Sequence, residues 1–346
     1  MRARRSRLPG LVALAAAASA VFAALAVLFP RPHGESRVEL DVTPVALDAS
    51  DPTRSGVGPL RYLGGLCLRS PDPRFGGLSD LRVSPDGLRL LAISDCGWGF
   101  TGRLAYGVDG NLAGLTDARL VELTGADGRP LAVGEDDAES LVAGDSLEVG
   151  FEGRGKILAY AAEPAFAGPP RRVPTPAGLS ACGWNQGLET MADLGDGRRL
   201  LVCEGRRGAS VTVPAWIGRA GSWAAREYPL LFDRGWAEEP FRPTAATRLP
   251  DGDVLVLERR FPPVGARLVR LSGVSLDGRG LLEPHEIARI EAPLTVDNFE
   301  GVEARRDAAG RTLVYLVSDD NNCSKTGSSR GSGLQRTLLL LFSLEG

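Results

Sequence analysis

Acidic residues recur in this sequence at a constant distance from a series of turns. Glu189 lies seven residues before the Asp of an Asp-Gly pair, and Glu300 lies seven residues before the turn residue Asp307. The apolar run after that second turn ends in Asp319-Asp320. Carboxylates that converge offer the hard oxygen ligands that Ca²⁺ prefers, and a bound cation can activate water for hydrolysis. The chemistry to look for is therefore cation binding and metal-assisted hydrolysis.

These acids belong to a unit that repeats along the chain. The units begin at Ser79, Glu139, Glu189, Thr244 and Glu300. Their apolar runs end at Asp95, Glu152, Glu204, Glu258 and Asp319. The starts recur about every 55 residues, a period typical of β-propellers, whose blades are sheets of about four strands.

Each unit has the pattern of a β-hairpin. Asp-Gly pairs separate short apolar runs, and Gly supplies the positive φ that tight turns need. The runs Leu88–Ser94, Arg199–Cys203 and Val254–Leu257 suit strands that are buried on both faces. Further strands are expected at Arg103–Tyr106, Ala118–Leu123, Lys156–Ala161, Trp216–Ile217, Leu268–Leu271 and Glu286–Ile290.

The sequence thus predicts an all-β fold, a single β-propeller over residues 57–346. We expect five blades, and a sixth would have to lie within residues 43–69, where the repeat is not legible. Leu60–Leu68 and Thr337–Leu344 are expected to close the ring by pairing N- and C-terminal strands, because closure removes exposed sheet edges. The 44 Gly and 24 Pro suit a domain rich in turns.

The propeller geometry brings the acids together. The start of each first strand and the end of the strand that returns beside it lie at the same end of the ring, opposite the turns. Close like charges repel one another, so three outcomes are open: bound calcium, pairing with basic neighbours, or a solvated acidic rim. The candidate metal ligands are Glu189, Glu300, Asp319 and Asp320, and the candidate substrate-binding residues are Arg259 and Arg336.

The first 30 residues have the features of a targeting segment. Four arginines at positions 2, 4, 5 and 7 precede the uncharged stretch 8–29, which is long enough to span a bilayer. A cleaved signal peptide and an uncleaved membrane anchor both fit. Either one predicts an exported domain, periplasmic or anchored at the inner membrane, that follows a tether over residues 31–56. Without those four arginines the net charge changes from −3 to −7, which argues against a nucleic-acid partner.

Other catalytic chemistries find little support. The sequence has two histidines, His33 and His285, and no Gly-x-Ser-x-Gly motif, which disfavours a Ser-His-Asp mechanism. Phosphate-binding loops and dinucleotide fingerprints are absent from the sequence as well.

Five cysteines suit an exported protein, in which disulfides can form. Cys203 lies inside an apolar run and is predicted to be a buried small hydrophobic residue. One disulfide among Cys96, Cys182 and Cys323 is plausible, and their connectivity stays open.

Several short motifs, taken together and in order, resemble the phytase-like domain of exported bacterial proteins, often described as esterase-like. The resemblance covers roughly residues 57–344. Its motifs are Phe75-Gly76-Gly77-Leu78-Ser79, Ser94-Asp95-Cys96-Gly97, Asn185-Gln186-Gly187-Leu188-Glu189, Asp297-Asn298-Phe299-Glu300-Gly301, Ser318-Asp319-Asp320-Asn321 and Gln335-Arg336-Thr337-Leu338-Leu339-Leu340.

The resemblance implies a propeller that hydrolyses phosphate esters or other esters. Calcium-dependent propeller phytases hold several calcium ions and bind phosphate with basic side chains, and their ligand pattern does not map residue by residue onto this chain. Asp80 stands where a small residue is expected, and the insert over residues 322–334 is longer than expected.

Two functions remain open at this stage. The first is an exported, metal-assisted hydrolase with calcium as cofactor and a small-molecule or phosphorylated substrate. The second is a non-catalytic ligand-binding or scaffold propeller at the cell envelope, because a fold alone does not imply a function. The lack of a recognisable nucleophile, base and histidine set keeps the second alternative open. Membrane contact through residues 8–29 is expected if the segment stays uncleaved.

Overall fold

The computed structural model describes residues 34–153, 155–182, 187–205, 210–232, 239–322 and 335–345. The expected targeting segment over residues 1–30 lies outside these ranges, as does the insert from residue 323 to residue 334. In the described ranges, no helix is both long enough and apolar enough to cross a membrane.

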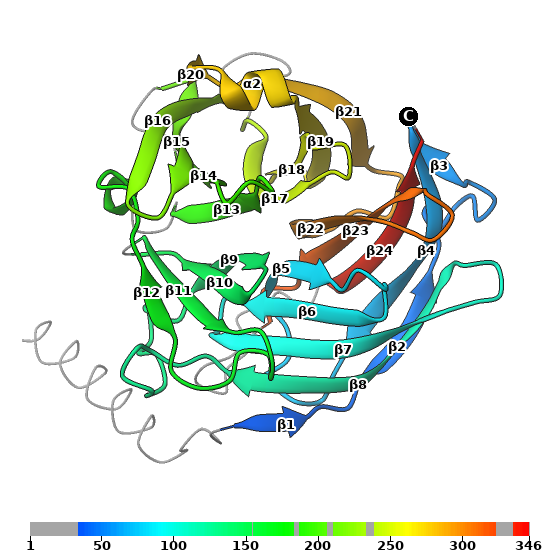
Figure 1. Ribbon diagram of the computed structural model, residues 1–346. Coiled ribbons are helices and arrows are strands. Elements are labelled where there is room, and N and C mark those ends of the chain that lie inside the picture. The colour runs from blue at the N-terminus through cyan, green and yellow to red at the C-terminus, as the bar shows by residue number, and fades with distance from the viewer. Residues whose placement is uncertain are drawn as a thin grey trace, which may run out of the picture.

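Five sheets surround a central axis as the blades of a propeller (Figure 1). Blade 1 contains, from the axis outward, β5 (Leu78–Val83), β6 (Arg89–Ser94), β7 (Trp98–Tyr106), β8 (Leu112–Glu122) and β1 (Glu35–Arg37). Blade 2 contains β9 (Ala138–Ala143), β10 (Ser146–Phe151), β11 (Lys156–Ala161) and β12 (Arg171–Val173). Blade 3 contains β13 (Leu188–Asp193), β14 (Arg199–Cys203), β15 (Thr212–Arg219), β16 (Ser222–Pro229) and the short parallel strand β20 (Gly280–Leu281).

Blade 4 contains β17 (Arg242–Arg248), β18 (Val254–Arg260), β19 (Gly265–Leu271) and β21 (Pro284–Glu291). Blade 5 contains β22 (Asn298–Arg306), β23 (Thr312–Asp319), β24 (Thr337–Leu344), β4 (Leu60–Arg69) and β2 (Asp41–Val45), and β3 (Gly56–Val57) pairs with β4. The remaining elements are a 3-10 turn, η1 (Leu179–Ala181), and one short helix, α2 (Gly273–Asp277). The five innermost strands contact one another around the axis in the order β5, β9, β13, β17, β22 and back to β5.

Blade 5 closes the ring as the sequence predicts. The C-terminal strand β24 pairs antiparallel with the N-terminal strand β4, so both ends of the chain contribute to one sheet. Residues 43–69, where a sixth blade could have been hidden, supply β3, β4 and part of β2 to blade 5. The described residues therefore form five blades.

The expected tether over residues 31–56 is different from a free linker. Within it, β1 pairs with β8 at the outer edge of blade 1, and β2 pairs with β4 at the outer edge of blade 5. These strands cover two sheet edges that would otherwise expose unpaired backbone groups. The propeller therefore begins upstream of residue 57.

The hairpin turns repeat the same local chemistry. The Oδ1 atom of Asp86 accepts the Leu88 N–H at 2.9 Å, and Oδ1 of Asp196 accepts the Arg198 N–H at 2.9 Å. Each Asp is followed by a Gly with positive φ, as at Gly87, where φ is 79°. An Asp that caps its own turn, followed by a Gly that permits the left-handed backbone, explains why these dipeptides end the innermost strands. We call this end of the channel the turn end.

Apolar side chains fill the space between blades. The largest such cluster joins blades 5 and 1, where Leu339 and Tyr315 are buried with Leu81 and Phe100. Runs such as Leu338–Phe342 are buried at every position, because strands between two neighbouring blades have no solvent-facing side. This accounts for the continuous apolar runs in the sequence.

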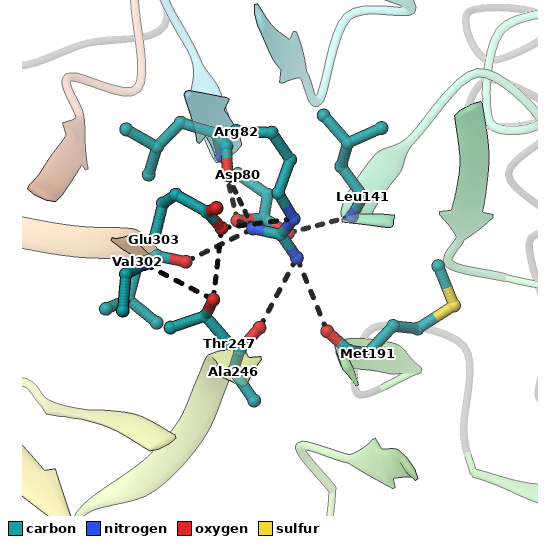
Figure 2. Close-up of polar contacts among 10 residues, drawn as sticks. Asp80, Arg82, Leu141, Met191, Ala246, Thr247, Val302 and Glu303 are labelled. Carbon is teal, nitrogen blue, oxygen red and sulfur yellow. Dashed lines mark hydrogen bonds and ion pairs between the residues drawn. The ribbon is translucent and has the colours of Figure 1, made fainter. Parts of the chain in front are cut away.

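The buried pair Arg82 and Asp80 connects all five innermost strands (Figure 2). Nη1 of Arg82, on β5, donates to Asp80 Oδ1 at 2.9 Å and to the Val302 carbonyl of β22 at 3.1 Å. Nη2 contacts the Ala246 carbonyl of β17 at 3.3 Å and the Met191 carbonyl of β13 at 3.5 Å.

Two carboxylates complete this central network. The Leu141 N–H of β9 donates to Asp80 Oδ2 at 2.8 Å, and the Glu303 Oε2 of β22 lies 3.6 Å from Arg82 Nε. Thr247 Oγ1 donates to the same oxygen of Glu303 at 3.0 Å. Asp80, which departs from the residue expected in the family, is thus part of the structure that holds the ring together.

We predict that Arg82→Met destabilises the propeller by about 3–5 kcal/mol, because it leaves Asp80 buried without its cation. Chemical denaturation followed by circular dichroism measures this loss. The control is Arg311→Met, which breaks an exposed ion pair with Asp307 and should cost at most about 1 kcal/mol. Equal losses in the two variants would show that the central network is energetically unimportant.

A second prediction concerns pH. Burial raises the pKa of Asp80 from 3.8 to about 6 and that of Glu303 from 4.5 to about 7, although Arg82 opposes both shifts. The folded state therefore binds protons more tightly than the unfolded state, and the free energy of unfolding falls as pH rises from about 4 to about 7. Glu303→Gln removes one of these groups. Between these pH values, the wild type should lose up to about 3 kcal/mol more than the variant in denaturant titrations. Parallel pH profiles would contradict this.

Candidate functional site

A β-bulge lies at the first repeat residue of every blade. In β13, Leu188 pairs with Cys203 and Thr190 pairs with Val202, so Glu189 has no partner across the hairpin. The register skips the residues Ser79, Glu139, Glu189, Thr244 and Glu300 in the five innermost strands. A bulge changes the direction in which a side chain points. The repeat in the sequence therefore corresponds to a repeated bulge, which directs one residue of each blade toward the same end of the channel.

Three of these bulge residues are glutamates, and we call the end of the channel where they lie the acidic mouth. Glu189 and Glu300 are buried, at 7% and 8% exposure, and Glu139 is half-buried. Burial raises the pKa of Glu189 well above its usual range, and the charges of Glu204, Glu152 and Glu300 raise it further. Burial also raises the pKa of Glu139 strongly, with Glu189 as the largest charge contribution.

The ends of the returning strands add carboxylates from blades 2 and 5. Burial raises the pKa of Glu152, which follows β10, to about 7. Burial also raises the pKa of Asp319, at the end of β23, to about 7. The pKa of the bulge residue Glu300 is raised to about 8 for the same reason. The structure therefore brings together acids that are far apart in the sequence, as the hairpin geometry predicts.

Arg259 is the described cation within this cluster. Its Nη2 lies 3.2 Å from Glu204 Oε1, and its Nε lies 3.1 Å from Glu300 Oε1. The side chain is 23% exposed, so it is still partly accessible to solvent. Pairing with a basic neighbour, one of the three outcomes expected, is thus realised for Glu204 and Glu300.

Glu139 and Glu152 have a different environment. Within the described ranges, no ion pair joins either of them to an arginine or lysine. Asp137, two residues before Glu139, adds a further negative charge beside both. The acidic run from Glu135 to Asp137 in the sequence is a signal that could have identified this side of the mouth.

Asp319 and Asp320 bind to backbone groups. Asp319 Oδ1 accepts the Asn321 N–H at 2.7 Å, and its Oδ2 lies 3.3 Å from Asn298 Nδ2. Asp320 Oδ1 accepts the N–H of Gly77 at 3.0 Å, which ties the end of blade 5 to the start of blade 1. Asp320 therefore has a structural role at the mouth, whatever else it binds.

Arg336 directly precedes β24 and lies at the same end of blade 5 as Asp319, beside the mouth. Its Nε is 3.2 Å from Asp297 Oδ2, and its side chain is 37% exposed.

The other two acids expected at the mouth behave differently from each other. Asp95 contributes charge beside Glu139, whereas Glu258 is fully buried and pairs with Arg267 and with the Tyr228 hydroxyl at 2.6 Å. Glu258 is therefore part of the buried interior between blades 3 and 4 and does not belong to the mouth.

One cysteine prediction needs correction. Cys203 is buried, but it forms a disulfide with Cys182, so it is not a free hydrophobic residue. This bond links the end of β14 to the segment after η1, next to the mouth. Cys96 is also disulfide-bonded, and Cys67 is the free cysteine among the described residues. Cys323 lies outside those residues.

The mouth suits a hard cation by its chemistry. Its donors are carboxylate oxygens whose mutual repulsion would be relieved by a bound ion. In the described part of the chain, no group of three or more His, Cys, Asp or Glu side chains is already arranged to hold a metal ion. Binding would therefore have to draw Glu139, Glu152 and Glu189 closer together.

Solved structures that resemble the chain share low sequence identity with it. A luciferin-regenerating enzyme is 9% identical, with a TM-score of 0.41, over 78% of this chain and 92% of that chain. The WD40 repeats of RRP9 are 10% identical, with a TM-score of 0.39, over 91% and 99% of the two chains. The aldose sugar dehydrogenase of Streptomyces coelicolor, in its PQQ-bound form, is 14% identical, with a TM-score of 0.37, over 88% and 99%. Similarity at this level says nothing about activity.

A search of curated proteins found no match. Residues 73–322 match the phytase-like family, whose description is esterase-like activity of phytase. This match spans the blades that carry the five bulges and the acids of the mouth. The chain therefore belongs to the phytase-like family.

Proposed function

We propose that the protein is an exported, calcium-assisted hydrolase that acts on a phosphate ester or another ester at the acidic mouth. The observation that carries the proposal is the convergence of Glu139, Glu152, Glu189 and Glu300 from three blades, with pKa values raised by burial and mutual charge. Perturbed carboxylates that gather in one place are typical of functional sites. Membership of a family described by esterase-like activity supports ester hydrolysis.

Five acids would hold the cation. Glu189, Glu300 and Asp319 are the sequence-predicted ligands whose charges interact across the mouth, and Glu139 and Glu152 extend this set. Asp320 stays a weaker candidate, because one of its oxygens already accepts the Gly77 N–H. When bound, Ca²⁺ would neutralise charge on the ester and lower the pKa of a bound water.

Arg259 would act on the ester itself. Glu300, whose pKa is raised to about 8 in the cation-free protein, would release its proton when it binds the cation. Arg259 is held in place by Glu204 and Glu300, so its guanidinium is positioned to stabilise negative charge on the substrate. Arg336 lies beside the mouth and would contribute a more distant positive charge.

The test of activity is a screen of phosphate and carboxylic esters, with calcium and with a chelator. We expect turnover that requires calcium. Glu189→Gln should lower kcat/KM by more than the roughly 10–100-fold that loss of an outer-shell partner costs, because Glu189 interacts with acids of blades 2, 3 and 5.

Glu39→Gln is the matched control, since Glu39 is an exposed glutamate between the outermost strands β1 and β2 and should leave turnover unchanged. No turnover of any ester in either condition would favour the alternative, a non-catalytic ligand-binding propeller at the cell envelope.

Calcium should also stabilise the fold. Binding to the folded state alone adds about 2.7 kcal/mol at a free concentration roughly one hundred times Kd. For the protein from residue 34 onward, chelation should lower Tm, and a Glu300→Gln, Asp319→Asn variant should show a smaller loss. Identical melting curves with calcium and with chelator would remove the metal from this proposal and leave a solvated acidic rim.

A further inference from the structure

The other end of the channel contains a second pocket. It has a volume of about 740 Å³ and is lined by residues from all five blades, among them Ser84, Gly144, Asp193, Pro250 and Glu303. These residues belong to the turn end or to the central network. The acids of the acidic mouth do not line this pocket. The two ends are therefore separate sites on one axis.

Arginines line this pocket in excess over acids. The two carboxylates in its wall, Asp193 and Glu303, already have partners: Arg199 Nη1 lies 2.5 Å from Asp193 Oδ1, and Glu303 faces Arg82. Arg89 also lines the wall and pairs with Glu163. Because both carboxylates of the lining are paired, the arginines of the lining that have no carboxylate partner give the pocket its charge.

Three arginines remain, Arg248 at the end of β17 and Arg305-Arg306 at the end of β22. None of the three has an ion pair to a carboxylate within the described ranges. The charges of Asp86 and Glu303 interact with Arg305 without forming an ion pair with it. Arg248 and Arg306 are exposed, so their guanidinium groups are accessible from solvent.

The local backbone makes room for two of these side chains. The guanidinium of Arg305 lies against Gly87, and that of Arg248 lies against Gly195, so a Cβ atom at either glycine would displace the arginine. Arg305 is further oriented by its Nε, which donates to the Tyr315 hydroxyl at 3.0 Å. Each glycine belongs to the hairpin turn of the blade next to the one that carries the arginine, so the turns place cations over the end of the channel.

We propose that the turn end is an anion-binding pocket for a small molecule that carries at least two phosphate or carboxylate groups. Guanidinium groups bind both kinds of anion through paired, charge-assisted hydrogen bonds, and three of them from two blades favour a ligand with more than one anionic group. The volume lies in the range of small-molecule sites. This site does not rest on the hydrolase proposal, because it uses none of the residues of the acidic mouth.

Isothermal titration of the full chain in detergent micelles, without divalent cations, tests the proposal. The probes are inorganic pyrophosphate and the tricarboxylate citrate, which separate phosphate from carboxylate ligands. We expect saturable binding of at least one probe that weakens as salt is added. Arg248→Gln and Arg306→Gln should each weaken it about tenfold or more, as loss of a charge-assisted hydrogen bond predicts.

Arg279→Gln is the matched control, because Arg279 is an exposed arginine outside the pocket and carries the same charge. Glu189→Gln, at the acidic mouth, should also leave binding unchanged. Absence of saturable binding for both probes would overturn the proposal. Equal weakening by Arg279→Gln and Arg248→Gln would overturn it too, since binding would then reflect net charge alone. Thermal melting of each variant verifies that the exposed substitutions leave the fold intact.

Discussion

The ring depends on how its axis is filled. Five strands that meet edge to edge around a channel direct backbone carbonyls of several blades toward the centre, and buried polar groups without partners are costly. Arg82 meets this constraint with one planar group, whose donors reach carbonyls of β13, β17 and β22 while Asp80 bonds to the backbone of β9. An arginine is suited to this position, because a lysine has a single ammonium group and lacks the planar fork. The same network divides the channel into two ends with separate chemistry.

The acidic mouth follows from a second repeated feature, the bulge at the start of each innermost strand. A regular strand would alternate its side chains across the sheet, whereas the bulge turns Glu139, Glu189 and Glu300 toward the axis. Blades 1 and 4 carry Ser79 and Thr244 at the same place, and the hydroxyl of Thr244 lies 3.4 Å from the Phe299 carbonyl. The acids thus gather on the side of blades 2, 3 and 5, and Arg259 from blade 4 reaches into the gap.

Much of this was predictable from spacing alone. Period, hairpin turns and terminal acids predict the five blades and the gathering of carboxylates, because these follow from a repeated local pattern, and the closing pair follows from the removal of exposed sheet edges in a propeller. Partners across blades are not local. Asp80 and Arg82 look like ordinary charges in a strand, and Arg259 looks like a free substrate ligand, until the ring places them beside Glu303 and Glu300. The Cys182–Cys203 bond also joins segments that no local pattern connects, and so do the pairing of β1 with β8 and the pairing of β2 with β4.

The charges along the axis restrict the chemistry that each end can support. Acids begin the innermost strands and arginines end two of them, so carboxylates gather at the mouth and arginines line the pocket at the turn end, where turn aspartates such as Asp86 and Asp196 lie outside the lining. An anionic ester that approaches Glu139 and Glu189 would meet like charge, which disfavours binding unless protons or a cation neutralise the mouth. Arg259 neutralises only the side of Glu204 and Glu300. Hydrolysis of a phosphate ester at this mouth would therefore require that protons or a cation neutralise the acids of blade 2, whereas a neutral carboxylic ester would need neither for its binding.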